Sequence, residues 1–363
     1  MGKRTARMFS SLSELEGLAA EVVPPNVWSY IEGAAGTGWT DRANREAFDR
    51  WVLQPRVLAG LRDVDLRTRL LGQEVRAPFY VAPTAYHGLI HPDGEKGTAA
   101  AASRAGILAM FSTLSSASLE EIGKVRPRGP RWFQLYLQPS WEGTEQLVRR
   151  AERSAFSAVV LTVDVPVLGV RDGQLTTGFA IDASIPVGSG PGVLPPSRGP
   201  EWAGGTYSLG KHPIESWDIV DRLRKVTKLP IVVKGILTAA DARASIEHGA
   251  SAVVVSNHGG RQLDRAPASL AALPEIVAAV DGRAEVYLDG GVRRGSDILI
   301  ALALGARAVG VGRPVLWALA RNGGAGVAQY LSLLTNDLVT AMVLAGRGSI
   351  SQVDRSLVIA NTP

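Results

Sequence analysis

The sequence predicts an α/β fold, a (β/α)8 TIM barrel with an N-terminal helical cap and a long loop after the fourth strand. The first observation behind this prediction is a repeated pattern. A helical stretch ends in small residues, an apolar run follows, and polar residues come directly after that run. The pattern occurs at 101–113, 151–163, 245–257 and 301–313. Apolar runs without alternation are typical of strands buried on both faces of a parallel sheet.

The second observation is that further apolar runs bring the expected strands to eight. They cover 77–85, 131–138, 229–235 and 284–291. Helical patterns separate them, for example at 142–154. Most strands follow one another at intervals of roughly 22–33 residues, which suits a strand–loop–helix unit, and eight such units in a row favour a closed barrel over a doubly wound sheet.

Three segments lie outside this repeat. Residues 1–75 predict the helical cap, with a Ser-x-x-Glu capping pattern from Ser11 to Glu14, and 324–346 predict a C-terminal helix. Between the fourth and fifth strands only one helix is needed, at 215–227. The Gly-, Pro- and Ser-rich stretch of about 172–213 therefore predicts a long mobile loop. We expect one barrel domain over 1–363.

Composition excludes several classes of function. The chain carries a formal charge of +5, but its basic residues are interleaved with acids, so nucleic acid is not an expected partner. The absence of cysteine excludes disulfides, thiolate metal sites and a cysteine nucleophile. No apolar run approaches the roughly 18–20 residues of a membrane span, so we expect a cytoplasmic protein with no membrane partner. We find no ligand spacing for a metal and expect none.

Polar residues collect where the expected strands end. In barrels of this type, function resides at the carboxyl ends of the strands. One polar strand end is usually a solvated turn, but these ends together supply a lysine, a histidine, two carboxylates and four arginines. In chain order they are Thr84, Ala85, Ser112, Gln134, Tyr136, Thr162, Asp164, Arg171, Lys234, Ser256, His258, Arg261, Asp289, Gly291, Arg293, Gly312 and Arg313. This concentration predicts an active site.

The last two strand ends predict a phosphate site. One carries Gly291 and Arg293, and the other carries Gly312 and Arg313 followed by Pro314, which suits the first position of a helix. Backbone N–H groups and the helix dipole at such a turn favour an anion, and a phosphate after strands seven and eight is common in these barrels.

Six motifs resemble one known family. They are "FQLY" (133–136), "LTVDVPVLG" (161–169), "LPIVVKG" (229–235), "SNHGGRQLD" (256–264), "LDGGVRRGSDI" (288–298) and "GVGRPV" (310–315). In this order they resemble the FMN-dependent α-hydroxy acid oxidases and dehydrogenases, which include glycolate oxidase, lactate oxidase, mandelate dehydrogenase and 4-hydroxymandelate oxidase. The resemblance covers nearly the whole chain and implies FMN as cofactor and a homotetramer.

The resemblance implies a role for each catalytic candidate. His258 would take a proton from the substrate as the α-carbon is oxidised, by a carbanion or a hydride route, and Asp164 would stabilise the protonated imidazole. Arg261, Arg171 and Tyr30 would hold the substrate carboxylate. Tyr136 would hydrogen-bond the substrate oxygen that becomes the ketone.

It also implies how FMN would be held. Lys234 would lie at the N1–C2=O edge of the flavin. The groups expected to line the isoalloxazine ring are Thr84, Ala85, Ser112, Gln134, Thr162 and Ser256. The groups expected at the ribityl chain and phosphate are Asp289, Gly291, Arg293, Gly312 and Arg313.

Three departures refine the expected reaction. Leu114 replaces a tryptophan of the short-chain members, which suggests room for a larger or aromatic, mandelate-like side chain. Val170 replaces a common arginine, which weakens the match beside Arg171. Ala85 in "PTA" resembles the oxidases, which pass electrons to O2. We therefore expect an (S)-2-hydroxy acid oxidase that forms a 2-keto acid and H2O2.

Four alternatives stay open. The same oxidation could use a quinone or an electron-carrier protein, or the substrate could be a short acid such as lactate or glycolate. An FMN barrel isomerase would not need the group of His258, Arg261 and Asp164. A flavin-binding protein without enzymatic activity would lose His258 and Tyr136.

Overall fold

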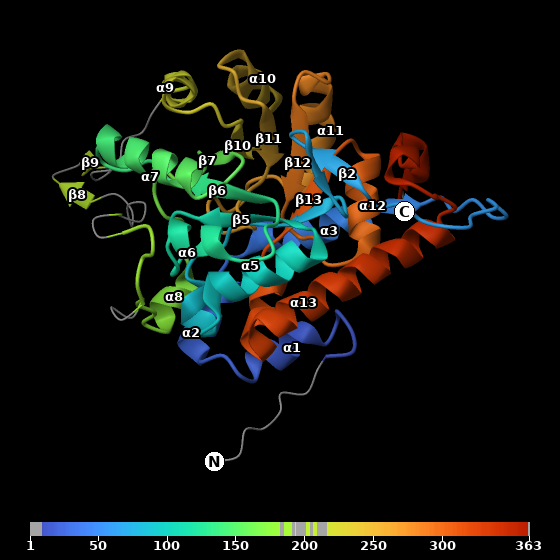
Figure 1. Cartoon of the computed structure of the whole chain (residues 1–363), viewed down its shortest axis with the longest axis horizontal. Coiled ribbons are helices and arrows are strands. Elements are labelled where there is room, and N and C mark those ends of the chain that lie inside the picture. Colours follow the sequence, from blue (N-terminus) through green and yellow to red (C-terminus); the bar gives the residue numbers. More distant parts are fainter. Residues whose placement is uncertain are drawn as a thin grey trace.

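The computed structural model describes residues 9–181, 185–190, 193, 201–203, 206–208 and 216–361. Eight parallel strands form a closed barrel with helices around it, so the predicted TIM barrel is confirmed (Figure 1). The barrel strands are β4 (Phe79–Val81), β5 (Leu108–Ser112), β6 (Arg131–Leu135), β7 (Val159–Thr162), β10 (Ile231–Ile236), β11 (Ala252–Val255), β12 (Glu285–Asp289) and β13 (Ala308–Val311). Seven of them fall within the predicted runs, and β10 extends one residue beyond its run of 229–235, to Ile236.

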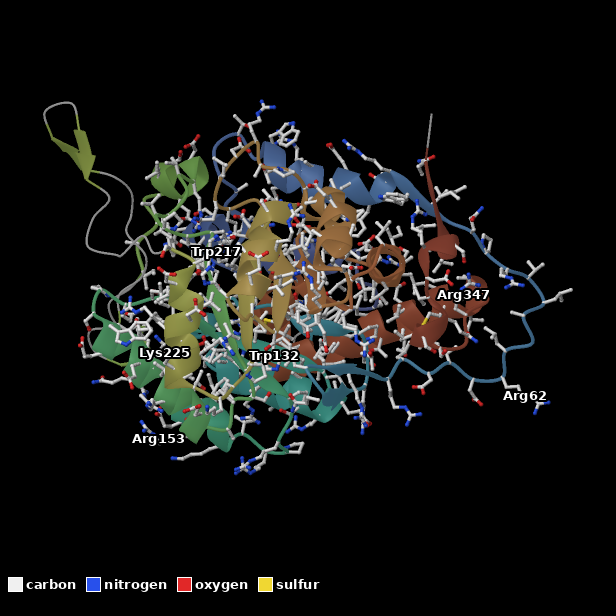
Figure 2. The ribbon with its side chains drawn as sticks, turned by 90° about the horizontal axis from the view of Figure 1, so that it is seen from above. Arg62, Trp132, Arg153, Trp217, Lys225 and Arg347 are labelled. Carbon is white, nitrogen blue, oxygen red and sulfur yellow. The ribbon has the colours of Figure 1, made fainter. Side chains whose placement is uncertain are left out.

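Both faces of the strands are buried, which explains why the runs do not alternate. One set of side chains fills the barrel interior, with Trp132 near its centre (Figure 2), and includes Tyr80, Met110 and Tyr287. The other set packs outward against the helices and includes Phe111. The barrel closes where β13 pairs with β4 in parallel.

The helices between strands mostly follow the predicted pattern. Those that complete the barrel units are α5 (Gly94–Ala105), α6 (Leu119–Lys124), α7 (Trp141–Arg153), α9 (Asp218–Val226), α10 (Ala239–Glu247), α11 (Ser269–Val280) and α12 (Gly295–Ala303). Side chains cap several of them; Ser118 and Glu121 form a capping box at α6. The short α4 (His87–Ile90) precedes α5.

The long α13 (Arg313–Leu344) contains a break. Its backbone leaves helical geometry at Asn322 and at Gly323, where φ is +55°, so it comprises the last barrel helix and the predicted C-terminal helix. By length and composition alone, α13 is the one helix of the described residues that could span a membrane. Its buried side chains pack against α1, α5 and α12.

The N-terminal cap is helical only in its first part. α1 (Leu15–Ala20), α2 (Pro25–Glu32) and α3 (Trp39–Asp49) confirm it that far. The expectation of helix up to residue 75 is wrong, because β1 (Trp51–Leu53) pairs with β14 (Val358–Ala360) and β2 (Thr68–Leu70) forms a hairpin with β3 (Gln73–Val75). Strands of three residues are too short to show a period in sequence.

Hydrogen bonds before α1 and two short 3-10 helices complete the fold. Ser11 donates its backbone N–H to Glu14, as the capping pattern predicts, but no side chain caps α1 itself. Single-turn 3-10 helices cover Ile350–Gln352 and Arg355–Leu357.

The predicted long loop lies between β7 and α9. It contains α8 (Asp172–Thr176) and a hairpin of β8 (Glu201–Ala203) with β9 (Thr206–Ser208). Residues 182–184, 191–192, 194–200, 204–205 and 209–215 of this loop lie outside the described residues, and its mobility stays a prediction.

Candidate active site

The turn after β11 directs a histidine back over the barrel mouth. His258, Gly259 and Gly260 all have positive φ, near +60° to +71°. A Cβ on Gly260 would lie 2.6 Å from the backbone of Asp41, so only glycine fits there. Ser256 accepts the His258 backbone N–H at 3.1 Å, which helps to hold this uncommon conformation.

His258 joins two of the predicted catalytic residues. Its Nδ1 lies 3.0 and 3.2 Å from the two carboxylate oxygens of Asp164, and its Nε2 lies 3.5 Å from the hydroxyl of Tyr136. Burial lowers the pKa of His258; Asp164 opposes the shift, while the charge of Lys234 adds to it. The imidazole is therefore neutral near pH 7, with Nε2 available as a base.

Asp164 stays ionised despite its burial. Burial by itself would raise the pKa of its carboxyl, but the charge and hydrogen bond of His258 and the charge of Lys234 lower it overall. Gly235 makes room for this side chain, because a Cβ there would lie 2.6 Å from the Asp164 Cβ. An ionised carboxylate on Nδ1 fixes the tautomer of His258 and stabilises its protonated form.

A buried polar group links β10, β11 and β12 at their carboxyl ends. Lys234 donates to Ser256 at 2.8 Å and lies 3.2 Å from Asp289, and Ser256 also donates to Asp289. The Lys234 and Asp289 side chains are only 5% and 8% exposed. Asp289 therefore pairs with Lys234 and compensates the buried ammonium.

A second polar ladder crosses the neighbouring strand ends. Ser112 donates to the side-chain oxygen of Gln134 at 3.0 Å, and the Gln134 amide donates to Thr162 at 3.0 Å. All three side chains are buried. The structure thus brings together the residues predicted to line one face of a ring.

The predicted carboxylate-binding residues lie in contact with one another, and the charge of Arg171 also acts on His258. Arg261 donates to the backbone carbonyls of Tyr30, Ile31 and Gly33 at the end of α2, and its guanidinium lies 5.4 Å from the Tyr30 ring centroid. Arg171 reaches the carbonyl of Arg261 at 3.3 Å. Neither guanidinium has a carboxylate partner among the described residues.

Two close, partly buried cations without a carboxylate partner among the described residues favour an anionic ligand. Burial, followed by the charges of Arg171 and Arg313, lowers the pKa of Arg261 to about 9, which still leaves it cationic at neutral pH. Burial also lowers the pKa of Arg171. A carboxylate bound between them would offset the cost of this burial.

The predicted phosphate residues lie on the turns after β12 and β13. Arg293 is held over the Trp317 ring at 4.9 Å and donates to the carbonyl of Val292. Arg313 instead pairs with Asp41 at 2.7 Å and donates to the Gly259 carbonyl. Arg313 begins α13, so Pro314 occupies the second helical position, and the expectation of the first position is wrong by one residue.

The chain matches one family of proteins over nearly its whole length. Residues 19–360 match the model of the FMN-dependent dehydrogenases. The chain belongs to this family. Its cofactor is FMN, as the resemblance implied.

Relatives of this FMN-dependent dehydrogenase match it along almost their whole length. It is 43% identical over 350 residues to 2-hydroxyacid oxidase 2 of Mus musculus, covering 96% of this chain and 97% of the relative. It is 40% identical to glycolate oxidase of Spinacia oleracea, covering 97% and 96%. A crystal structure of mandelate oxidase with benzoyl-formic acid is 43% identical, covers 95% and 97% of the two chains and has a TM-score of 0.87.

The residues at the barrel mouth fit FMN. Arg293 is partly buried near Arg313 and Arg45, and the loss of solvent and these charges lower its pKa, so a phosphate there would be stabilising. A Cβ on Gly312 would meet only a methyl group of Thr84, at 3.7 Å, so the turn leaves space for a group to approach its backbone. Lys234 supplies a buried cation beside the Ser112–Gln134–Thr162 ladder, where a positive charge would stabilise a reduced flavin.

The remaining predicted residues lie around this mouth. Thr84, Ala85 and Tyr86 lie in the loop after β4. Leu114 lies in the loop after β5 and is only 6% exposed, and its carbonyl accepts the backbone N–H of Tyr86. Gly291 has a φ of +81°, and a Cβ there would lie 2.4 Å from the Asn44 carbonyl oxygen. The turn at Gly291 therefore requires glycine, whatever it binds.

Sequence reasoning missed two buried residues of this FMN-dependent dehydrogenase. His87 bonds to Thr84 at 2.6 Å and to Thr98 at 3.0 Å. Glu95 accepts backbone N–H groups from His87 and from Ser116 and so joins the loops after β4 and β5. The "HGLIHPDGE" stretch contained both residues, but only the fold shows that Glu95 is 1% exposed.

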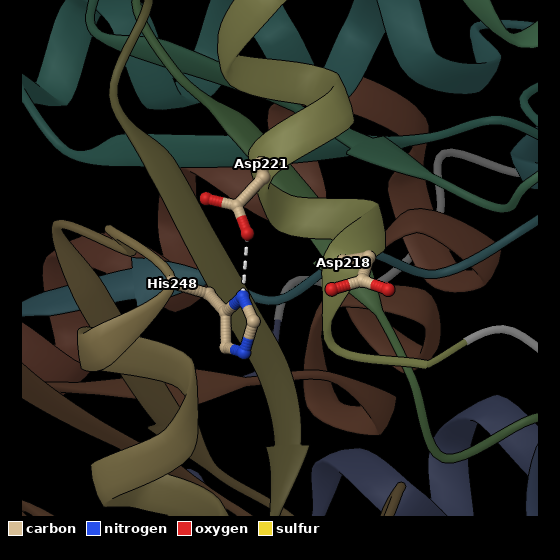
Figure 3. A group of neighbouring side chains, drawn as sticks. All are labelled: Asp218, Asp221 and His248. Carbon is tan, nitrogen blue, oxygen red and sulfur yellow. Dashed lines mark hydrogen bonds and ion pairs between the residues drawn. The ribbon is translucent and has the colours of Figure 1, made fainter.

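A histidine and two aspartates also meet on the outer surface, at a spacing the sequence did not reveal. His248 Nδ1 lies 2.5 Å from Asp221, and Asp218 lies beside them at the start of α9 (Figure 3). Asp218 accepts a hydrogen bond from Ser216 at 3.1 Å. These contacts account for the group as a hydrogen-bonded pair that joins α9 to the end of α10, with Asp218 beside it.

Proposed function

We propose that this protein uses bound FMN to oxidise a 2-hydroxy acid to the 2-keto acid. The observation that carries the proposal is the group at the mouth of the barrel. A neutral His258, oriented by Asp164 and adjacent to Tyr136, lies beside two arginines that lack a carboxylate partner among the described residues. An isomerase has no need of this combination of a base and an anion site. The names of the relatives support the same chemistry.

Each residue has a definite task in this reaction. Arg261 and Arg171 bind the substrate carboxylate through their forked N–H groups and so fix the α-carbon. His258 accepts a proton from the substrate at Nε2, and the Asp164 carboxylate stabilises the imidazolium that results. Tyr136 donates to the substrate oxygen; burial raises its pKa, so its hydroxyl stays protonated. FMN, when bound, accepts the two electrons.

The substrate we propose is an (S)-2-hydroxy acid with a large or aromatic side chain. Leu114 lies where short-chain members of the family carry tryptophan, and leucine leaves more room for the side chain. The match to mandelate oxidase structures holding (S)-2-phenylpropionate or benzoyl-formic acid supports this proposal. We propose O2 as the acceptor, because Ala85 matches the oxidases. The alternative acceptor is a quinone or an electron-carrier protein.

We further propose a cytoplasmic homotetramer. The loop between β1 and β2 projects outward beside the C-terminus (Figure 1) and carries Arg62 at its tip (Figure 2). Val57 and Leu58 on this loop are 83% and 101% exposed. Apolar side chains on a projecting loop favour burial against another subunit. Light scattering should give four times the chain mass for the wild type and a smaller mass for Leu58→Glu; a monomeric wild type would contradict the tetramer.

A substrate panel tests the reaction. Anaerobic mixing with mandelate, lactate and glycolate should reduce the flavin, fastest with (S)-mandelate, and subsequent mixing with O2 should restore it with formation of H2O2. Reduction by none of a broad panel of 2-hydroxy acids would refute the reaction. Faster reduction by glycolate would refute the substrate proposal, and slow reoxidation by O2 but fast reoxidation by a quinone would favour the alternative acceptor.

A further inference from the structure

The side chain of Gln262 lies at the centre of the contacts between two active-site segments. Its amide nitrogen donates to the backbone carbonyls of Asp164 at 3.0 Å and Val167 at 2.8 Å. Its oxygen accepts the backbone N–H of Gly169 at 3.2 Å and a guanidinium N–H of Arg171 at 3.4 Å. All four partners belong to the segment after β7. A carboxamide has two donors and two main acceptor positions, so every hydrogen-bonding position of the Gln262 side chain is used by this one segment.

The segment from 164 to 171 carries two groups that must be placed against the turn after β11. Asp164 must meet His258, and Arg171 must lie beside Arg261. Gly169 allows the closest approach, because a Cβ there would lie 2.5 Å from the carbonyl oxygens of both Arg261 and Gln262. The two segments are thus in direct backbone contact, and the Gln262 side chain fixes how they are aligned.

Few other hydrogen bonds hold this segment. Val163 N–H donates to Lys234 at its start, and Val170 accepts from Gly36 near its end. Between these points, the Gln262 amide holds the backbone carbonyls of both Asp164 and Val167. No residue type other than glutamine offers both two donors and an acceptor at this reach, since asparagine is one methylene shorter and glutamate lacks donors.

We propose that Gln262 is a positioning residue that aligns Asp164 with His258 and Arg171 with Arg261. This inference rests on the proposed function, because it concerns how the base and the carboxylate site are held together. Gln262 touches neither reacting atom, and it acts through the two residues that it places. Its loss should therefore affect both substrate binding, through Arg171, and proton transfer, through Asp164.

Gln262→Met tests the proposal, with Leu263→Gln as the control. Methionine keeps the length and volume of glutamine but removes its four hydrogen bonds, whereas Leu263 is an exposed neighbour. Misplacement of catalytic groups by about 1 Å can cost about 100-fold in rate. We expect Gln262→Met to retain FMN, to slow anaerobic flavin reduction by about 10- to 100-fold and to raise KM for the 2-hydroxy acid. Leu263→Gln should match the wild type. Gln262→Asn gives the same comparison if the methionine variant does not fold.

A titration of His258 in the FMN-bound protein tests the positioning without any turnover. The charged groups that act on His258 are Asp164, which raises its pKa, and Lys234 and Arg171, which lower it; the effect of Asp164 is the largest of the three. Displacement of Asp164 should therefore move the NMR titration midpoint of His258 to lower pH in Gln262→Met but not in Leu263→Gln. His258→Asn identifies the resonance.

The two readouts separate failure of this inference from failure of the proposed function. A wild type that no 2-hydroxy acid reduces would refute the function, and the titration would still decide the role of Gln262. The inference would be overturned if Gln262→Met had the same His258 titration midpoint as Leu263→Gln. Where a 2-hydroxy acid reduces the wild type, the reduction rate and KM of Gln262→Met would also have to lie within twofold of those of Leu263→Gln.

Discussion

Replacement of Asp164 by asparagine gives a quantitative test of the base. The substitution keeps the shape of the side chain and removes the charge that faces His258 Nδ1 at 3.0–3.2 Å. The two side chains are only 21% and 13% exposed, so solvent screens the pair weakly. Opposite charges about 4 Å apart, at an effective dielectric constant of about 20, interact by about 4 kcal/mol.

That interaction exists only once His258 carries a proton, so its loss falls on the rate of proton transfer. The asparagine oxygen can still accept the Nδ1–H, which retains about 1 kcal/mol. The remaining 3 kcal/mol corresponds to a rate lower by about 100- to 200-fold, at about 1.4 kcal/mol per factor of ten.

Anaerobic stopped-flow reduction of the flavin by a saturating 2-hydroxy acid measures this rate directly. Asp221→Asn is the matched control, because it removes the carboxylate of a second His–Asp pair, which lies on the outer surface with His248 (Figure 3). We expect the control to reduce at the wild-type rate. A rate for Asp164→Asn within threefold of the wild type, with FMN bound, would refute the role of the carboxylate.

Three further predictions concern the same mouth. Burial lowers the pKa of His258 below its ordinary 6.5, and the base acts when it is neutral. The kcat/KM of flavin reduction should therefore fall only below pH 6.5, and a fall in kcat/KM with a midpoint above pH 7 would contradict the neutral base. Arg261→Lys should raise KM about 10- to 100-fold with FMN retained, because lysine cannot make the three carbonyl contacts of Arg261 and also bind the substrate carboxylate with two N–H groups. An unchanged KM would show that the substrate carboxylate binds elsewhere. Leu114→Trp should lower the kcat/KM ratio of mandelate to glycolate at least about tenfold, and an unchanged ratio would show that Leu114 does not border the substrate.

The barrel was predictable because its physical signals are local. A strand buried on both faces needs an unbroken apolar run, and a parallel strand ends where polar groups begin, as "VVVSNH" shows at β11. The strand-end rule then placed His258, Asp164 and Lys234 at one mouth. The short strands after Asp49 lacked such a signal, since three residues cannot show a period.

Side-chain pairing was less predictable, because it depends on contacts between distant segments. The sequence singled out "SNHGGRQLD" but gave Gln262 no task, and the four partners of its side chain lie more than 90 residues away. Arg313 was expected at the phosphate, and the fold shows that it also pairs with Asp41. No spacing rule joins His248 to Asp221, because α9 and α10 become neighbours only in the folded barrel.

The central claim is that His258 at the end of β11 removes a proton from a 2-hydroxy acid while FMN accepts its electrons. The most direct measurement is an anaerobic titration of the FMN-bound wild type and His258→Asn with (S)-mandelate, following flavin absorbance and the 2-keto acid formed. We expect the wild type to lose the oxidised-flavin spectrum and to form one 2-keto acid per flavin. We expect His258→Asn to do neither on the same timescale. Equal reduction of both proteins would contradict the central claim.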